Sequence, residues 1–212
     1  NLLGASGDPT IARLRDAAID AVRDADYVKQ PVPLSWTRTL DKMAALRSTK
    51  PYLTLPEATR LASDCGVSPN DANTMLTLFH DLGVVTYFHT ISGLENYVVL
   101  EPQWLIKLLS LVVQDFALHW LDVWDDPKWN SPRFSSDVEA LRKEALLTRE
   151  LLDELWTAEP PPVRDFVRTL MLKTWLMAPW ESSDGVLRNR EVYLVPSLLE
   201  VSSTVGAAIP DT

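Results

Sequence analysis

The residues that most often carry chemistry are few in this sequence and lie far apart. There are three histidines, at positions 80, 89 and 119, and one cysteine, Cys65. No histidine has a second metal ligand at the spacing of a helical zinc motif, and a single cysteine completes neither a zinc cluster nor an internal disulfide. We interpret Cys65 as a small buried hydrophobic residue in a reducing, cytoplasmic setting. His80 ends a predicted helix, where contact with solvent or the helix dipole is the ordinary role.

Glycine and carboxylate patterns of known catalytic sites are also missing. None of the seven glycines precedes a lysine, so the phosphate-binding loop of NTPases is absent. Neither a dinucleotide fingerprint nor a Gly-x-Ser-x-Gly elbow occurs. The paired acids Asp125 and Asp126 precede Pro127, which is typical of a turn or helix cap. We therefore predict no catalytic, cofactor-binding or metal-binding residue in this chain, and no enzyme activity of its own.

The composition indicates a folded, acidic chain. Hydrophobic residues make up 46% of the 212 residues, and 29 acidic against 20 basic residues give a net charge of -9. This hydrophobic fraction is sufficient for a hydrophobic core. The negative net charge disfavours nucleic-acid binding, because phosphate backbones repel an acidic surface. No run of 18 apolar residues predicts a membrane span. Because the sequence begins at Asn1 and not at methionine, we expect a piece of a longer protein.

Three short helices followed by a β-hairpin are predicted between residues 35 and 100. Thr54 with Glu57 forms a capping box, and Ser68 with Pro69 starts the third helix. Strands are predicted at 84–88 and 97–100, with a turn near Gly93. This layout is that of a winged helix. The side chains predicted to face its core are Trp36, Leu40, Met43, Leu46, Leu55, Ala58, Leu61, Ala62, Ala72, Met75, Leu76 and Phe79.

A similar order is predicted for the second half. Residues 136–156 are helical in one or two pieces, and an amphipathic helix follows three prolines at 160–162. Short strands are expected within 175–179 and 192–199. The predicted fold class is mainly α with small antiparallel β-hairpins (α+β), winged-helix-like, with two such units in tandem as an open alternative. The predicted domains are a connector helix (1–30), a winged-helix-like subdomain (31–103), a helical subdomain with a short β-hairpin (104–200) and a frayed tail (201–212).

The third helix argues against DNA binding. In helix-turn-helix proteins this helix enters the major groove with Arg, Lys, Asn or Gln side chains. Residues 68–83 contain no Lys or Arg, although Asp71 and Asp81 are present. A DNA-binding role is therefore the least favoured of the binding functions.

Eight tryptophans are the most unusual feature of the composition. Four lie on apolar helical faces and are predicted to be core: Trp36, Trp104, Trp156 and Trp175. Trp120, Trp124 and Trp129 lie in an irregular segment, where a lid over the core and a contact with a partner remain equal alternatives. Together with the proline-rich hinge before the second helix, they give our predicted partner interface: Pro31, Pro33, Trp36, Trp120, Trp124 and Trp129.

Five segments occur in an order that resembles one family, the COR domain (C-terminal of Roc) of Roco proteins. The segments are PLSW (33–36), FHDLG (79–83), EPQWL (101–105), LLTRELLDELW (146–156) and LVPSLL (194–199). The resemblance covers about residues 30 to 200 and points to the first half of COR. The tryptophan-rich stretch at 116–134 departs from the family pattern and is interpreted as a lineage-specific insertion.

The resemblance implies a non-catalytic relay domain in a signalling protein. In Roco proteins a Ras-like GTPase domain, Roc, precedes COR, so GTP or GDP with Mg²⁺ would bind next to this chain and not in it. The implied partners are Roc in cis, the second half of COR in cis, and a second copy of the parent protein, with a kinase domain or leucine-rich repeats elsewhere. The alternative from the residues alone is a winged-helix interaction module of a signalling ATPase.

Overall fold

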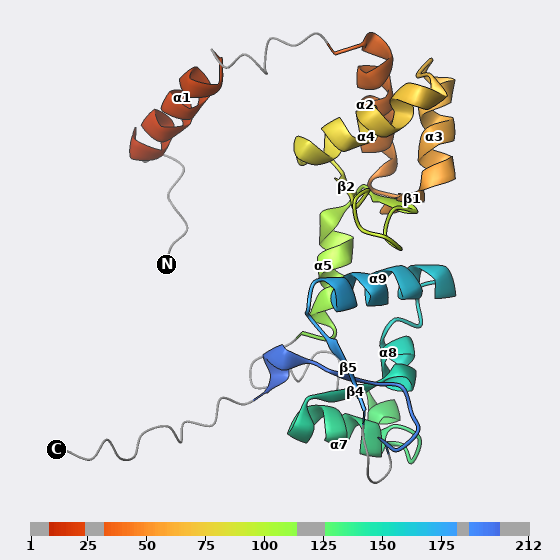
Figure 1. Cartoon of the computed structure of the whole chain (residues 1–212). Coiled ribbons are helices and arrows are strands. Elements are labelled where there is room, and N and C mark those ends of the chain that lie inside the picture. Colours follow the sequence, from red (N-terminus) through yellow and green to blue (C-terminus); the bar gives the residue numbers. More distant parts are fainter. Residues whose placement is uncertain (1–8, 24–31, 114–125, 182–186, 200–212) are drawn as a thin grey trace, which may run out of the picture.

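The structure, a computed structural model, describes residues 9–23, 32–113, 126–181 and 187–199 (Figure 1). Within these residues the chain is mainly helical with two small antiparallel sheets of three strands, which confirms the predicted α+β class. The helices are α1 (Pro9–Arg23), α2 (Leu34–Leu46), α3 (Leu55–Asp64), α4 (Pro69–Asp81), α5 (Pro102–Ser110), α7 (Ser135–Glu144), α8 (Arg149–Leu155) and α9 (Pro161–Lys173). The strands are β1 (Tyr52–Thr54), β2 (Thr86–Tyr87), β3 (Tyr97–Val99), β4 (Leu146–Thr148), β5 (Ala178–Trp180) and β6 (Val192–Leu194), and the short 3-10 helices are η2 (Pro127–Asn130) and η4 (Pro196–Leu198).

The first unit runs from α2 to β3. Its sheet has the order β1-β3-β2, and both outer strands pair antiparallel with β3, so that Leu53 and Tyr87 both lie opposite Val98. Helices α2, α3 and α4 cover this sheet through buried side chains such as Met43 and Phe79. All four residues predicted to be buried in the third helix are buried: Ala72, Met75, Leu76 and Phe79. Strand β1 was not predicted, because three residues that run directly into a helix cap show no alternation.

The second unit runs from α7 to β6 and has the same order of elements. Its elements follow one another as one helix, one strand, two helices and two strands. The strands form a sheet of order β4-β6-β5, in which Leu147 and Pro179 both lie opposite Tyr193. Helix α5 lies between the two units and contacts α9 (Figure 1). The α9 stripe predicted from periodicity is buried throughout: Val163, Phe166, Val167, Leu170 and Met171.

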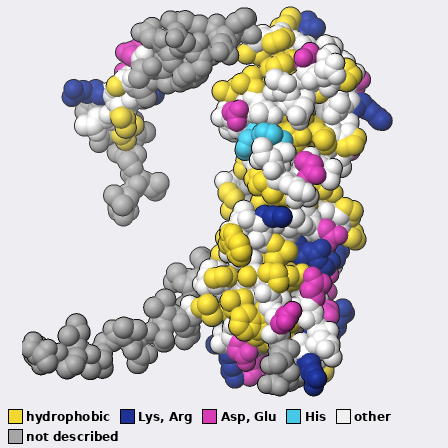
Figure 2. All heavy atoms as spheres, viewed as in Figure 1, with side chains coloured by type: hydrophobic (Ala, Val, Ile, Leu, Met, Phe, Trp, Pro, Cys, Tyr) yellow, Lys and Arg dark blue, Asp and Glu magenta, His cyan; other side chains and the backbone are white. Residues whose placement is uncertain are grey.

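Helix α1 presents apolar side chains to solvent. Ile11, Leu14 and Ile19 are 53%, 72% and 47% exposed, and the helix stands away from the two units in Figure 1. Hydrophobic side chains are visible on its surface in Figure 2. Among the helices of the described residues, none is long and apolar enough to cross a membrane.

The helix ends follow simple local chemistry. The Thr54 side chain accepts from the Glu57 amide, and the Glu57 carboxylate accepts from the Thr54 amide at 2.9 Å, so the predicted capping box is present. Helix α4 ends at Asp81, and Gly83 follows its C-cap with a φ of +69°, which suits a residue without Cβ. Its N–H donates to the His80 carbonyl at 2.8 Å, and the Val84 N–H donates to the Phe79 carbonyl at 2.9 Å.

A buried ion pair fixes the second unit. The Asp137 carboxylate is 1% exposed and accepts two bonds from the Arg190 guanidinium, both at 2.7 Å. The Thr148 hydroxyl donates to the same carboxylate at 2.8 Å while capping α8. These bonds join the start of α7, the end of β4 and the loop before β6. The bond with Asp137 raises the pKa of Arg190 well above its ordinary value despite partial burial, so the guanidinium stays charged.

We predict that Asp137→Ala lowers the free energy of unfolding by about 3–5 kcal/mol, because Arg190 and the Thr148 hydroxyl lose their buried partner. Urea unfolding followed by circular dichroism measures this loss. The double variant Asp137→Leu with Arg190→Met is the control, and we expect it to recover part of the stability. A double variant less stable than Asp137→Ala would contradict the assignment.

The capping box predicts a pH dependence. The hydrogen bonds from Lys50 and the Thr54 amide lower the pKa of Glu57 to about 2 from its ordinary value of 4.5. Because the folded state holds this proton less tightly than the unfolded chain, Glu57 stabilises the fold above pH 4.5, and this contribution disappears as the pH falls towards 2. The difference in unfolding free energy between wild type and Glu57→Gln should therefore shrink over this range. If urea titrations gave the same difference in unfolding free energy at every pH, the predicted role of Glu57 would be refuted.

Candidate interaction site: the joint between the two units

The β2–β3 hairpin of the first unit packs on α9 of the second. Leu94 in its loop is fully buried in the same hydrophobic cluster as Phe166. The ring centroids of Tyr97 and Phe166 are 4.9 Å apart, and those of Phe88 and Phe166 are 6.5 Å apart. The loop passes so close to α9 that a Cβ on Gly93 would lie 3.4 Å from the Thr169 methyl group. The loop therefore meets another part of the same chain.

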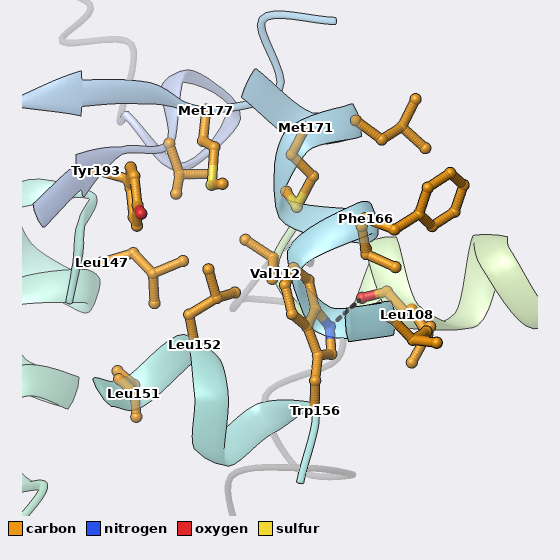
Figure 3. Packing of buried hydrophobic residues seen from close by; sticks show 14 of the residues in the cluster. Leu108, Val112, Leu147, Leu151, Leu152, Trp156, Phe166, Met171, Met177 and Tyr193 are labelled. Atoms are coloured by element: carbon orange, nitrogen blue, oxygen red, sulfur yellow. Dashed lines mark hydrogen bonds between the residues drawn. The ribbon is translucent and has the colours of Figure 1, made fainter. Parts of the chain in front are cut away.

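Helix α5 provides the second half of this contact. The Trp156 indole is 1% exposed, and its Nε1–H donates to the Leu108 carbonyl oxygen at 3.0 Å (Figure 3). The Trp104 Nε1–H donates to the Glu159 carboxylate at 2.9 Å, and its ring lies 5.0 Å from that of Tyr52. We call Phe88, Tyr97, Trp104, Trp156 and Phe166 the joint. Burial followed by the charge of Asp165 raises the pKa of Tyr97, so its phenol stays neutral.

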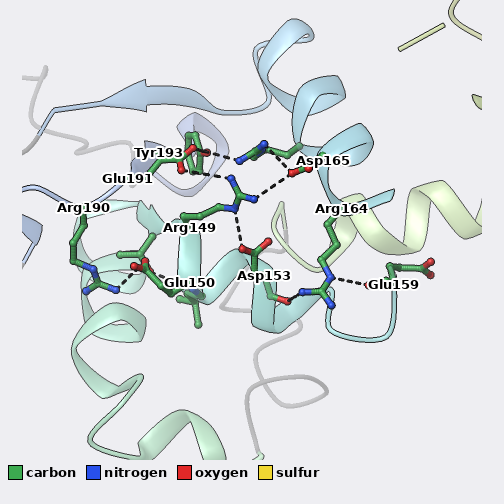
Figure 4. A network of polar contacts seen from close by, with 12 residues as sticks. Arg149, Glu150, Asp153, Glu159, Arg164, Asp165, Arg190, Glu191 and Tyr193 are labelled. Atoms are coloured by element: carbon green, nitrogen blue, oxygen red, sulfur yellow. Dashed lines mark hydrogen bonds and ion pairs between the residues drawn. The ribbon is translucent and has the colours of Figure 1, made fainter. Parts of the chain in front are cut away.

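A network of ion pairs surrounds α9 (Figure 4). Arg149 of α8 lies 2.9 Å from Asp153, 3.2 Å from Asp165 and 3.5 Å from Glu191. Burial lowers the pKa of Arg149, but the bond to Asp153 and the nearby acids outweigh it and give a net increase. Arg168 pairs with Asp165 at 2.8 Å and with Glu191 at 3.4 Å.

The other arginine of α9 is also engaged. Arg164 donates to the backbone carbonyls of Glu159, Asp153 and Thr157 at 2.7, 3.3 and 3.4 Å. Both arginines of α9 are therefore bound to groups within the chain, and α4 carries no Lys or Arg. Neither helix offers free guanidinium groups to a phosphate backbone.

The structure brings together two histidines that the sequence separates. The ring centroids of His80 and His89 are 6.3 Å apart. The Nδ1 atom of His80 accepts the Tyr87 N–H at 3.4 Å, and the Tyr87 hydroxyl donates to the Asn73 side chain at 3.0 Å. His80 thus covers the backbone of an edge strand. Across the described ranges, no group of three or more His, Cys, Asp or Glu residues is placed to hold a metal ion.

The predicted partner residues differ in how far the structure buries them. Pro33 is exposed, and Trp36 is half-buried against the core of the first unit. Trp129 is 3% exposed and packs edge-on against Phe134 at 5.6 Å, so the lid alternative describes it and little of its surface is open to a partner. Pro31, Trp120 and Trp124 lie outside the described residues.

The core prediction for Trp175 is wrong. Its side chain is 77% exposed and its φ is +60°. The apolar pattern of α9 continues past Lys173, but the helix ends there and the chain turns at Thr174. Periodicity alone does not locate that end, because no glycine marks it. Trp156 is buried as predicted, whereas Trp104 is only partly buried.

Comparison with known proteins shows which family this chain belongs to. The sequence model of the family described as "C-terminal of Roc, COR-A domain" matches residues 33–199, which is most of the chain. The chain belongs to the COR-A family. The resemblance drawn from the five sequence segments is thereby confirmed.

Two individual proteins are similar to this COR-A chain. The solved structure of Methanosarcina barkeri Roco2 RocCORdC bound to GDP superposes with a TM-score of 0.60 at 20% sequence identity, over 89% of this chain and 49% of that one. The probable serine/threonine-protein kinase roco5 of Dictyostelium discoideum is 31% identical over 67 residues, which are 31% of this chain and 2% of that protein. The chain thus spans about half of the solved structure and a small part of the curated relative.

The joint predicts coupling between the two units. Phe166→Ala should cost about 3–5 kcal/mol of stability and should speed amide exchange in the hairpin, residues 86–99, more than in α2 or α3. Native-state hydrogen–deuterium exchange measures this. The control is Leu151→Ala, which removes a fully buried side chain of the same cluster on the side away from Phe166 (Figure 3). Equal acceleration of the hairpin in both variants would argue against a direct coupling through Phe166.

Proposed function

We propose that this COR-A chain is a non-catalytic relay between a Ras-like GTPase domain, Roc, and a dimerising or effector module of a Roco signalling protein. The observation that carries the proposal is the joint, because it joins the unit near the N-terminal connector to the unit at the C-terminal end. The family match and the likeness to a Roc–COR structure solved with GDP support it. We keep residues 31–103 as a winged-helix-like subdomain and 104–200 as a helical subdomain with a short β-hairpin, with two winged-helix-like units in tandem as the alternative.

The joint suits a relay because close-packed cores transmit displacement instead of absorbing it. Phe166 and Trp156 are 2% and 1% exposed, and the cluster around them draws residues from β3, α5, α8 and α9. A displacement of the first unit is therefore transmitted to the second unit as a rigid-body movement and is not absorbed by a loop. Rigid-body movement of this kind is a common element of switching proteins.

The N-terminal side provides the input in this proposal. In this proposal helix α1 is the connector from a preceding GTPase domain, and its exposed Ile11, Leu14 and Ile19 give an apolar face for that domain. Pro33 and the half-buried Trp36 then mark the hinge into the first unit. We retain Pro31, Pro33, Trp36, Trp120 and Trp124 as proposed partner contacts, and we withdraw Trp129 because it is buried.

Nucleotide chemistry belongs to the neighbouring domain in this proposal. The sequence has no phosphate-binding loop, so GTP or GDP with Mg²⁺ would bind in Roc. The second half of COR in cis and a homodimer of the parent protein are the proposed partners on the output side. A kinase domain elsewhere in the parent chain is in line with the name of the roco5 relative.

Calorimetry tests the proposal directly. The region encoded immediately upstream of this chain is expressed separately, loaded with GDP or with a non-hydrolysable GTP analogue, and titrated with this chain. We expect an affinity that differs between the two nucleotides, because only a differential affinity can shift a two-state switch.

The control is a variant of this chain with three polar substitutions on α1, Ile11→Ser, Leu14→Ser and Ile19→Ser, which should weaken binding in both states. Two folded partners that bind equally in both nucleotide states would rule out the relay. Absence of any binding would leave an interaction module with a different partner.

A further inference from the structure

Trp175 occupies a backbone position that normally belongs to glycine. The Trp175 N–H donates to the Leu172 carbonyl at 3.4 Å, and the Leu176 N–H donates to the Met171 carbonyl at 3.0 Å. Helices α3 and α4 end with the same pair of bonds, and there the left-handed residue is Gly66 (φ +86°) or Gly83 (φ +69°). A side chain at φ +60° costs on the order of fivefold in the folding equilibrium relative to glycine.

Little inside the described fold offsets this cost. The Trp175 indole is 77% exposed, whereas Trp156 and Trp129 are 1% and 3% exposed. A bulky residue in a strained conformation, turned mostly towards solvent, is a recurrent mark of a functional contact. A partner that covers this indole would offset the cost of the left-handed backbone.

Trp175 and the last described residues lie on segments that leave the second sheet at the same end. Ala178 pairs with Leu194, so the segment before β5, which contains Trp175, and the segment after β6 leave the same end of the sheet. That second segment is η4 followed by Leu199, which is 49% exposed. Figure 2 shows hydrophobic side chains gathered over the C-terminal end of α9 and around η4. We call Trp175, Pro196 and Leu199 the Trp175 surface.

The size of this surface indicates a tethered partner. A tryptophan side chain presents about 150–250 Å², so Trp175 and Leu199 together offer a few hundred Å² of apolar area. Two independent proteins need about 800 Å² each for a stable complex. A partner in the same polypeptide forms the contact at a high effective concentration and manages with less area. Because the described chain leaves the sheet at the same end as the segment that contains Trp175, the polypeptide continued beyond it is the best-placed occupant.

We propose that Trp175 anchors the following half of the COR domain to this one, by inserting its indole into an apolar pocket of that half. This inference rests on the proposed function for the identity of the occupant. It assigns the strained residue at the end of α9 to the output side of the relay, opposite to the input at α1.

Hydroxyl-radical footprinting tests the contact. This chain and the parent chain continued through the second half of COR are oxidised in parallel, and modification at single residues is read by tandem mass spectrometry. The internal reference is Trp180, which is 45% exposed and five residues away in the sequence. We expect oxidation of Trp175 to fall several-fold in the longer protein while that of Trp180 changes little. Equal oxidation of Trp175 in both proteins overturns the proposal, and so does protection that needs the upstream GTPase domain.

A substitution separates anchoring from folding. Because glycine suits the left-handed position, Trp175→Gly should leave the folding equilibrium of this chain unchanged or improve it by up to about fivefold. In the longer protein the same change should speed limited proteolysis between the two halves. Trp180→Thr, which replaces another exposed tryptophan by a strand-forming residue, is the matched control and should not.

Two outcomes overturn the assignment. One is strong destabilisation of this chain by Trp175→Gly, which would make the indole part of the fold. The other is an unchanged cleavage rate in the longer protein. The nucleotide titration described above tests a different surface. If Trp175 proves not to be an anchor, the GTPase-coupled relay still stands. If the titration rules out the relay, the footprinting result at Trp175 is not affected.

Discussion

The packing of the β2–β3 hairpin against Phe166 is the contact on which the rest of the structure depends. Neither sheet is large enough to be stable alone, since β2 has two residues and every other strand has three. The hairpin gains its stability by burying Leu94 and part of Tyr97 and Phe88 on α9. Helix α9 in turn is covered by its own sheet on one side and by the first unit on another. The core of the second unit therefore includes residues of the first unit, such as Leu94 and Val99, while the first unit keeps a separate cluster around Phe79.

The charges follow from the same arrangement. Arg149, Arg168 and Arg190 each face two or more carboxylates within the second unit, so an acidic chain uses these cations to hold its own elements together. Asp137 is the buried member of these networks, so its removal deprives Arg190 of its buried partner.

Sequence reasoning succeeds where one periodic face decides the structure and fails where contacts are long-range. The stripes of α4 and α9 are predictable residue by residue, because helical spacing places Phe79 and Phe166 inward. Strands β1 and β4 are missed, because each has three residues and ends at a threonine that caps the next helix.

The joint and the end of α9 are the main failures. The joint depends on residues far apart, such as Phe88 and Phe166, and the only local signal is the two aromatic side chains carried by one hairpin. Trp175 is misplaced because an apolar period does not reveal where a helix stops when a tryptophan stands in place of glycine.

The edges of the two sheets have a consequence for self-association. Bonds from Val195 to Ala145 and from Arg149 to Glu191 direct alternate residues of β6 towards β4, so Tyr193 lies in that set and Pro179 opposite it faces the open side of β5. Proline has no N–H to offer there. At β2 of the other sheet, the outward N–H of Tyr87 is already taken by His80. The β5 and β2 edges thus offer few free N–H groups to a foreign strand, which disfavours edge-to-edge aggregation at these two strands.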